Sequence, residues 1–110
     1  MRVGILGSTE LNFKAEDMYR YAKNIAYPRE ITAIVTTEDV GVAATARDIA
    51  ESRGLGLMTY SYYRDVVDDC DLVIVFRTDL ERPTYGKYAG YKGRPFQEYV
   101  VHIDKNVNCE

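Results

Sequence analysis

The sequence has no tryptophan and is poor in residues that bind metals or act as nucleophiles. It holds two cysteines and one histidine in 110 residues. Cys70 and Cys109 form neither a CxxC pair nor a zinc-ligand spacing, so we expect both to be reduced structural thiols. His102 lies in the apolar run YVVHI, a pattern typical of a half-buried strand, with no recognisable nucleophile near it. The sequence therefore predicts no metal site and no cofactor.

Two phosphate-binding motifs are also missing. No GxxxxGK[ST] stretch occurs, which excludes a P-loop. The dinucleotide fingerprint GxGxxG is absent too, since Gly4 and Gly7 enclose two apolar residues. Any phosphate site must be built in another way.

The chain carries no strong charge and no long apolar run. A net charge of −3 gives no general attraction to nucleic acid or to anionic membranes. No apolar stretch approaches the roughly 20 residues of a bilayer span, and no signal-peptide core follows Met1. We expect a cytoplasmic protein without membrane or nucleic-acid partners. Its length predicts a single domain over residues 1–110.

Strand-like and helix-like patterns alternate along the first two thirds of the chain. Apolar, β-branched runs predict strands at 2–6, 30–36, 55–60 and 71–76. Apolar residues at three- and four-residue spacing predict helices after the first two strands, and a short helix is expected over 63–69. The pattern predicts a single three-layer Rossmann-like α/β domain. Its mostly parallel sheet should have four or five strands, with helices on both faces.

Four residues are expected to mark the helix ends. Asn12 and Asp39 are candidate N-caps of the first and second helices, because their side chains can accept backbone N–H groups. Pro28 should stop the first helix and Gly54 the second.

Residues 77–95 are too rich in glycine, proline and charge for regular structure. We expect a long loop that contributes to function, because Lys87 stands among tyrosines and can pair with phosphate. A solvated excursion is the alternative. The strand expected over 98–104 can then be parallel to the fourth, which requires a crossover, or antiparallel at an edge.

Tyrosine is abundant, with ten residues against three phenylalanines. The clusters are Tyr60, Tyr62 and Tyr63, and Tyr85, Tyr88 and Tyr91. Tyrosine suits interfaces as well as half-buried surfaces. The sequence thus predicts self-association to a homo-oligomer through a tyrosine-rich surface, with packing inside a monomer as the alternative.

The candidate ligand site lies at the carboxyl ends of the predicted strands, where open parallel sheets bind ligands. The segment after the first strand offers backbone N–H groups and hydroxyls. The segment after the second strand offers hydroxyls at the start of a helix, and the segment after the fourth offers a guanidinium. The segments contribute Gly7, Ser8, Thr9 and Glu10; Thr36, Thr37 and Gly41; and Arg77, Thr78 and Asp79. Together with Lys87 they are expected to bind a nucleotide or nucleotide-derived small molecule.

The same segments resemble a known superfamily over residues 1–76. A strand ending in Gly-Ser, a helix, a second strand with a loop ending in Gly41, and the helix GVAATARDIAESRGL are similar to SLOG domains. These Rossmann-like domains are named after the Smf/DprA and Lonely Guy proteins, and the likeness is to their small stand-alone bacterial and phage branch. The resemblance implies nucleotide-type binding by Gly7, Ser8 and the loop before Gly41.

The chain also departs from that family. Thr36 and Thr37 stand where the family loop carries paired glycines, and RTDLERPTYGKY replaces the Lonely Guy hydrolase motif PGGxGTxxE. The resemblance therefore favours non-catalytic binding or sensing. Two alternatives remain: a small enzyme acting at an N-glycosidic bond with Glu10, Asp79 or Glu81 as its carboxylate, and an interaction protein that keeps only the fold.

Overall fold

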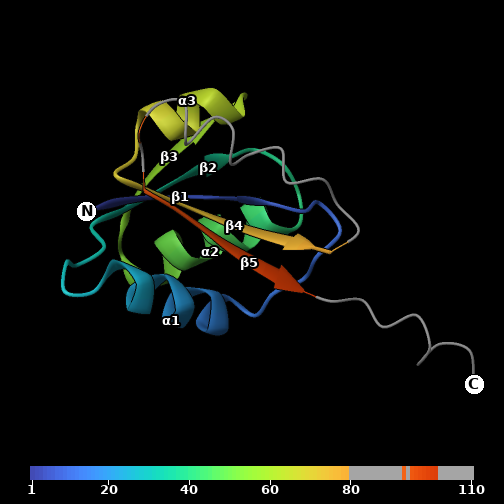
Figure 1. Ribbon diagram of the computed structural model, residues 1–110, viewed down its shortest axis with the longest axis horizontal. Helices are drawn as coiled ribbons and strands as arrows, with labels where there is room; N and C mark the ends of the chain where they lie inside the picture. Colours follow the sequence, from blue (N-terminus) through green and yellow to red (C-terminus); the bar gives the residue numbers. More distant parts are fainter. Residues whose placement is uncertain (80–92, 94, 102–110) are drawn as a thin grey trace, which may run out of the picture.

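The computed structural model describes residues 1–79, 93 and 95–101, and it shows one parallel sheet. Five strands lie in the order β3-β2-β1-β4-β5, and every neighbouring pair is parallel (Figure 1). The strands are β1 (Arg2–Gly7), β2 (Ala33–Thr37), β3 (Gly56–Tyr60), β4 (Leu72–Thr78) and β5 (Phe96–Val101). All carboxyl ends therefore meet at the same edge.

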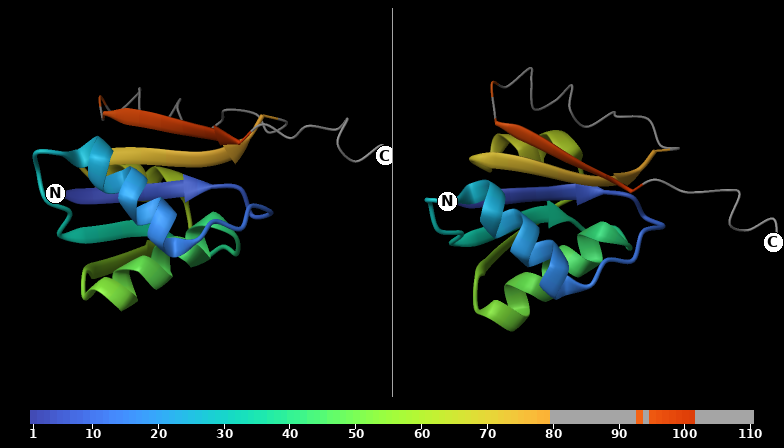
Figure 2. Two further views of the ribbon diagram at one scale, coloured as in Figure 1. Left: turned by 90° about the horizontal axis from the view of Figure 1, so that it is seen from below. Right: turned by 60° about the horizontal axis from the view of Figure 1, so that its bottom comes forward.

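The described helices cover the sheet on both faces. Helices α1 (Ala15–Ala26) and α2 (Val42–Arg53) lie on one face, and α3 (Tyr63–Asp68) lies on the other. Figure 2 shows α1 and α2 side by side in front of the strands. This confirms the predicted three-layer Rossmann-like α/β fold. None of the described helices is long and apolar enough to cross a bilayer.

The last strand is parallel to its neighbour. β5 pairs with β4 from Val73 opposite Phe96 to Thr78 opposite Val101. The antiparallel alternative considered for this strand is therefore wrong. A parallel pair needs a crossover connection, and most of the chain between β4 and β5, residues 80–92 and 94, lies outside the described residues.

The two faces of the sheet bury cores of different size. The larger core lies under α1 and α2 and includes Met18, Ile34 and Ile49, each at most 1% exposed. The smaller core lies under α3. There Gly4 lets the helix approach β1, since a Cβ at this position would stand 2.8 Å from the sulfur of the buried Cys70.

An aromatic cluster joins α1 to the β4–β5 side of the sheet. The rings of Phe13, Tyr21 and Tyr99 surround the buried Phe76, and the Phe13–Phe76 and Tyr21–Tyr99 centroids lie 5.0 and 4.8 Å apart. Burial raises the pKa of Tyr21, and the neighbouring Tyr99 raises it further. Tyr21 and Tyr99 thus pack within the monomer. This is the alternative to self-association that was expected for the tyrosines.

The helix ends match the sequence prediction at their carboxyl termini only. Helix α1 ends before Pro28, and α2 ends at Gly54 in the left-handed conformation. The predicted side-chain caps are wrong. Helix α1 starts after Lys14 instead of Asn12, and α2 starts after Gly41 while the Asp39 carboxylate accepts the Thr37 hydroxyl.

β1 separates from β2 before it separates from β4. The β1–β2 register runs only to Gly4 opposite Val35, whereas the β1–β4 register continues to Gly7 opposite Phe76. Beyond the last β1–β2 pair, the buried Thr36 hydroxyl donates to the Ile5 carbonyl at 2.6 Å. A side chain thus bonds β2 to β1 beyond the last residue pair of their register.

This hydroxyl gives a stability prediction. Thr36→Val keeps the side-chain shape but leaves the buried Ile5 carbonyl without the Thr36 donor, so we expect a loss of about 1–2 kcal/mol in the free energy of unfolding. Thr59→Val is the matched control, since Thr59 is opposite Thr36 in the register and exposed on β3. Urea denaturation of both variants tests this, and an equal effect would contradict the role of the hydroxyl.

Candidate functional site

The strand order places the candidate site between β1 and β4. From β1 the chain moves outward through β2 to β3, then returns to β4 on the other side of β1. Ligands of open parallel sheets bind outside the carboxyl ends of the strands where the order reverses in this way. The loop that starts at Gly7 and Ser8 leaves β1 at this point (Figure 1).

Gly7 and Ser8 are held tightly against β4. A Cβ at Gly7 would collide with the carbonyl oxygen of Phe76, so only glycine fits. The next amide, that of Ser8, donates to the same carbonyl at 3.0 Å. Ser8 is 3% exposed as a result. Gly7 was predicted to let a ligand approach the backbone, but the packing of β1 against β4 already requires a glycine at this position.

The β1 loop is also bonded to the start of α2. The Val42 amide donates to the Ser8 carbonyl at 2.9 Å. A Cβ at Gly41 would stand 2.5 Å from that same oxygen, and Gly41 has φ 74° and ψ −127°, a conformation that L-residues avoid. Gly41 therefore permits the close contact between the two loops.

Three hydrogen-bond donors at this junction have no acceptor among the residues that the structure describes. The Ser8 hydroxyl accepts the Glu10 amide at 3.0 Å and still carries its own proton. In the first turn of α2, no acceptor among the described residues pairs with the amides of Ala43 and Ala44, and helical geometry supplies none there. These three donors lie where the positive end of the α2 dipole faces the β1 loop.

The end of β2 is occupied by internal contacts. Thr36 is fully buried and its hydroxyl is bonded to β1. Thr37, 3% exposed, donates to the Asp39 carboxylate at 3.0 Å. Arg47 of α2 donates to the carbonyls of Thr37 and Asp39 at 2.7 and 2.9 Å and so fixes this loop. Sequence reasoning missed Arg47, because its position inside a helix gives no signal of a loop contact.

The third segment lies at the same edge, but its guanidinium faces β5. Arg77 is paired with Glu98 of β5 at 2.8 Å and donates to the Thr78 carbonyl at 2.9 Å. Its side chain is 13% exposed. The Asp79 amide donates to the Val101 carbonyl at 3.0 Å. The structure therefore brings Arg77 to the carboxyl edge and uses its charge to bind β4 to β5.

Among the described residues, the exposed groups at this edge are mainly acidic. Thr9, Glu10, Glu38 and Asp79 are exposed around the buried Ser8. The predicted Lys87 lies outside the described residues, as do Glu81, Tyr85, Tyr88, Tyr91, His102 and Cys109. Within the described part of the chain, no three His, Cys, Asp or Glu residues gather in a way that could hold a metal ion.

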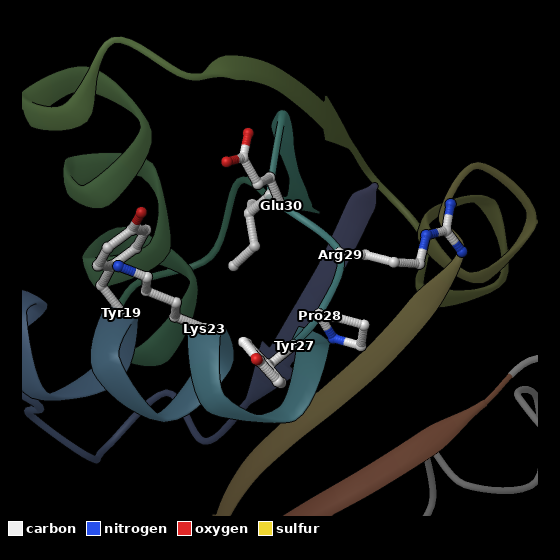
Figure 3. Close-up of a pocket in the computed structure, with 7 residues that line it drawn as sticks. Tyr19, Lys23, Tyr27, Pro28, Arg29 and Glu30 are labelled. Atoms are coloured by element: carbon white, nitrogen blue, oxygen red, sulfur yellow. The ribbon is translucent and has the colours of Figure 1, made fainter.

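A separate surface cavity of about 440 Å³ lies at the opposite edge of the sheet. It is formed by the end of α1 and the segment that follows, and its lining residues are Tyr19, Lys23, Tyr27, Pro28, Arg29, Glu30 and Ile31. Figure 3 shows Glu30 above the cavity and Arg29 extending away from the other side chains. Its charged lining residues are Lys23, Arg29 and Glu30, and it lies away from the carboxyl ends of the strands, where open parallel sheets bind ligands. We therefore place the candidate site at the carboxyl edge.

Fold and site together define a Rossmann-like α/β domain with a polar strand-to-helix junction at its switch point. The chain matches no protein-family model, no curated protein and no solved structure.

The junction between the two loops gives a second stability prediction. Gly41→Ala forces a strained backbone and a clash with the β1 loop, so we expect a loss of about 3 kcal/mol. Gly54→Ala is the control, because Gly54 also has positive φ but nothing lies within 4 Å of an added Cβ. It should lose about 1 kcal/mol. Thermal and urea denaturation measure both, and equal losses would contradict the tight loop contact.

Proposed function

We propose that this domain binds a nucleotide-derived small molecule at the junction between the β1 loop and α2, without catalysing its conversion. The observation that carries the proposal is the strand order, which puts Ser8 and the start of α2 at the switch point of an all-parallel sheet. The SLOG resemblance implies the same location, around Gly7, Ser8 and Gly41.

The donors at the junction fit one phosphate group. The Ser8 hydroxyl and the amides of Ala43 and Ala44 supply three hydrogen bonds to phosphate oxygens, and the α2 dipole favours the negative charge. Arg77 is not required for this, because Glu98 already neutralises its charge.

The acidic groups narrow the ligand class. A carboxylate after the second strand of such a sheet is well placed to accept ribose hydroxyls, and Glu38 stands directly after β2 and is exposed. Glu10 and Asp79 would repel a highly charged polyphosphate. The balance favours a nucleoside carrying one or two phosphates, such as a nucleoside monophosphate, a cyclic nucleotide or ADP-ribose.

A binding role is supported better than cleavage of an N-glycosidic bond. The chain carries RTDLERPTYGKY where the Lonely Guy hydrolases that it resembles carry their catalytic motif, and cleavage would need a carboxylate placed to stabilise a developing oxocarbenium ion. Of the three carboxylates expected for that role, Glu10 and Asp79 are exposed at this edge and Glu81 lies outside the described residues. The enzyme and the fold-only interaction protein are therefore alternatives that the binding experiment must separate.

The test is a ligand screen with a charge variant at the third position of α2. Nucleoside monophosphates, cyclic nucleotides, NAD and ADP-ribose are screened by thermal shift, and the affinity of each stabilising ligand is measured by calorimetry. Ala44→Glu places a carboxylate beside the free amides, so we expect at least a tenfold loss of affinity by charge repulsion. Folding should persist, because acidic side chains are favourable in the first turn of a helix.

Ala44→Gln is the matched control, with the same size and no charge. It should keep affinity within about threefold of the original chain. Equal affinity of both variants would show that the phosphate lies elsewhere. Absence of any stabilising ligand would favour the fold-only alternative, and appearance of free base in product analysis would favour the enzyme.

A further inference from the structure

Strand β3 is exposed to a degree unlike the other strands. Four of its five residues are exposed, and the apolar side chains of Leu57 and Met58 are 42% and 41% exposed. The register with Ile34 and Val35 places these two side chains on opposite faces of the sheet. Apolar surface is thus open on both faces of the same edge strand. Figure 2 shows this strand at the margin of the sheet, beside α2.

Among the described strands, the backbone of β3 is paired on one side only. It forms hydrogen bonds with β2, and it is the last strand in the sheet order. The Gly56 amide donates to the Thr32 carbonyl at 3.1 Å, so Gly56 faces β2. Because alternate residues of a parallel strand face the same neighbour, Met58 and Tyr60 face β2 as well. Leu57 and Thr59 therefore direct their N–H and C=O groups toward the open edge.

In the part of the chain that the structure describes, this edge lacks the features that keep exposed strands apart. Natural sheets protect their edges with charged side chains, prolines, bulges or a covering segment. The stretch 55–63, LGLMTYSYY, holds no charged residue and no proline, and β3 pairs with β2 over all five residues without a bulge. It also contains the cluster of Tyr60, Tyr62 and Tyr63 for which the sequence predicted self-association.

We propose that β3 pairs antiparallel with β3 of a second copy of this chain, across a two-fold axis at Met58. The two sheets then form one continuous sheet of ten strands. Leu57 of each copy exchanges both backbone hydrogen bonds with Thr59 of the other, which gives four inter-chain bonds. The two Met58 residues face each other as a non-hydrogen-bonded pair of the antiparallel ladder, the type of pair in which opposite side chains lie closest.

Self-complementarity is the reason to assign the edge to a second copy. A two-fold contact must fit its own surface, and an uncharged strand brings no like charges together when it meets itself. At the two-fold axis, Met58 presents an apolar side chain on one face of the sheet. Leu57, next to the axis, presents an apolar side chain on the other face. Because one short strand supplies a small contact, we expect a dissociation constant of about micromolar magnitude.

The first test measures mass against concentration by sedimentation equilibrium. The original chain should approach twice its 12.5 kDa monomer mass at tens of micromolar and above. Met58→Lys brings two like charges together at the axis, and Leu57→Pro removes a donor that faces only the open edge, so both should stay monomeric. Gln97→Lys adds the same charge to an exposed position on β5 and should still dimerise.

The second test reads the register directly. In a Cys109→Ser background, Met58→Cys should form an inter-chain disulfide under mild oxidation, because position 58 faces itself across the axis. Leu57→Cys should not, since position 57 faces position 59 and the two thiols stand too far apart.

Three results would overturn the proposal. The first is a monomeric chain at high concentration, and the second is a dimer that survives both edge variants. The third is a monomer that binds extended peptides through β3, which would assign the edge to another protein. Ligand binding at the carboxyl edge is independent of all three, so the proposed function can fail or hold separately.

Discussion

The structure depends on the backbone of Ser8 being bonded on two sides. Its amide donates to the Phe76 carbonyl of β4, and its carbonyl accepts the Val42 amide of α2. Neither contact is possible with a larger residue at Gly7 or at Gly41, because an added Cβ would meet the partner backbone at once. The two glycines therefore join the central strands of the sheet to the start of α2. Through them the loop that would hold a ligand becomes part of the folded core.

This arrangement divides the polar groups at the carboxyl edge into two sets. One set maintains the fold: the Thr36 hydroxyl bonds β2 to β1, Arg47 fixes the β2 loop, and Arg77 links β4 to β5. The other set, the Ser8 hydroxyl and the first amides of α2, points to where a ligand would bind. A site of this kind is fixed before the ligand arrives, which reduces the entropy lost on binding. Its surrounding carboxylates favour a ligand with hydroxyl groups and little negative charge.

The layered fold could be predicted from the sequence because its strands are apolar runs separated by helical spacing, and because Gly54 and Pro28 are strong stop signals. The caps at Asn12 and Asp39 could not, since Asp39 finds a nearer partner in Thr37 and a glycine starts the helix instead. Local sequence placed Gly7, Ser8 and Arg77 at one edge. It could not show that Glu98, 21 residues further along, takes the charge of Arg77. Such pairing depends on which strands become neighbours, and β5 was ambiguous until its parallel register was known.

Amide chemical shifts test most directly whether a ligand binds beside Ser8 and the start of α2, as proposed. The labelled chain is titrated with a nucleoside monophosphate or with ADP-ribose, and each amide resonance is followed by NMR. Binding at this junction should give saturable shifts that are largest at Ser8, Thr9, Ala43 and Ala44. Shifts confined to residues 19–31, which line the cavity at the opposite edge, would contradict it.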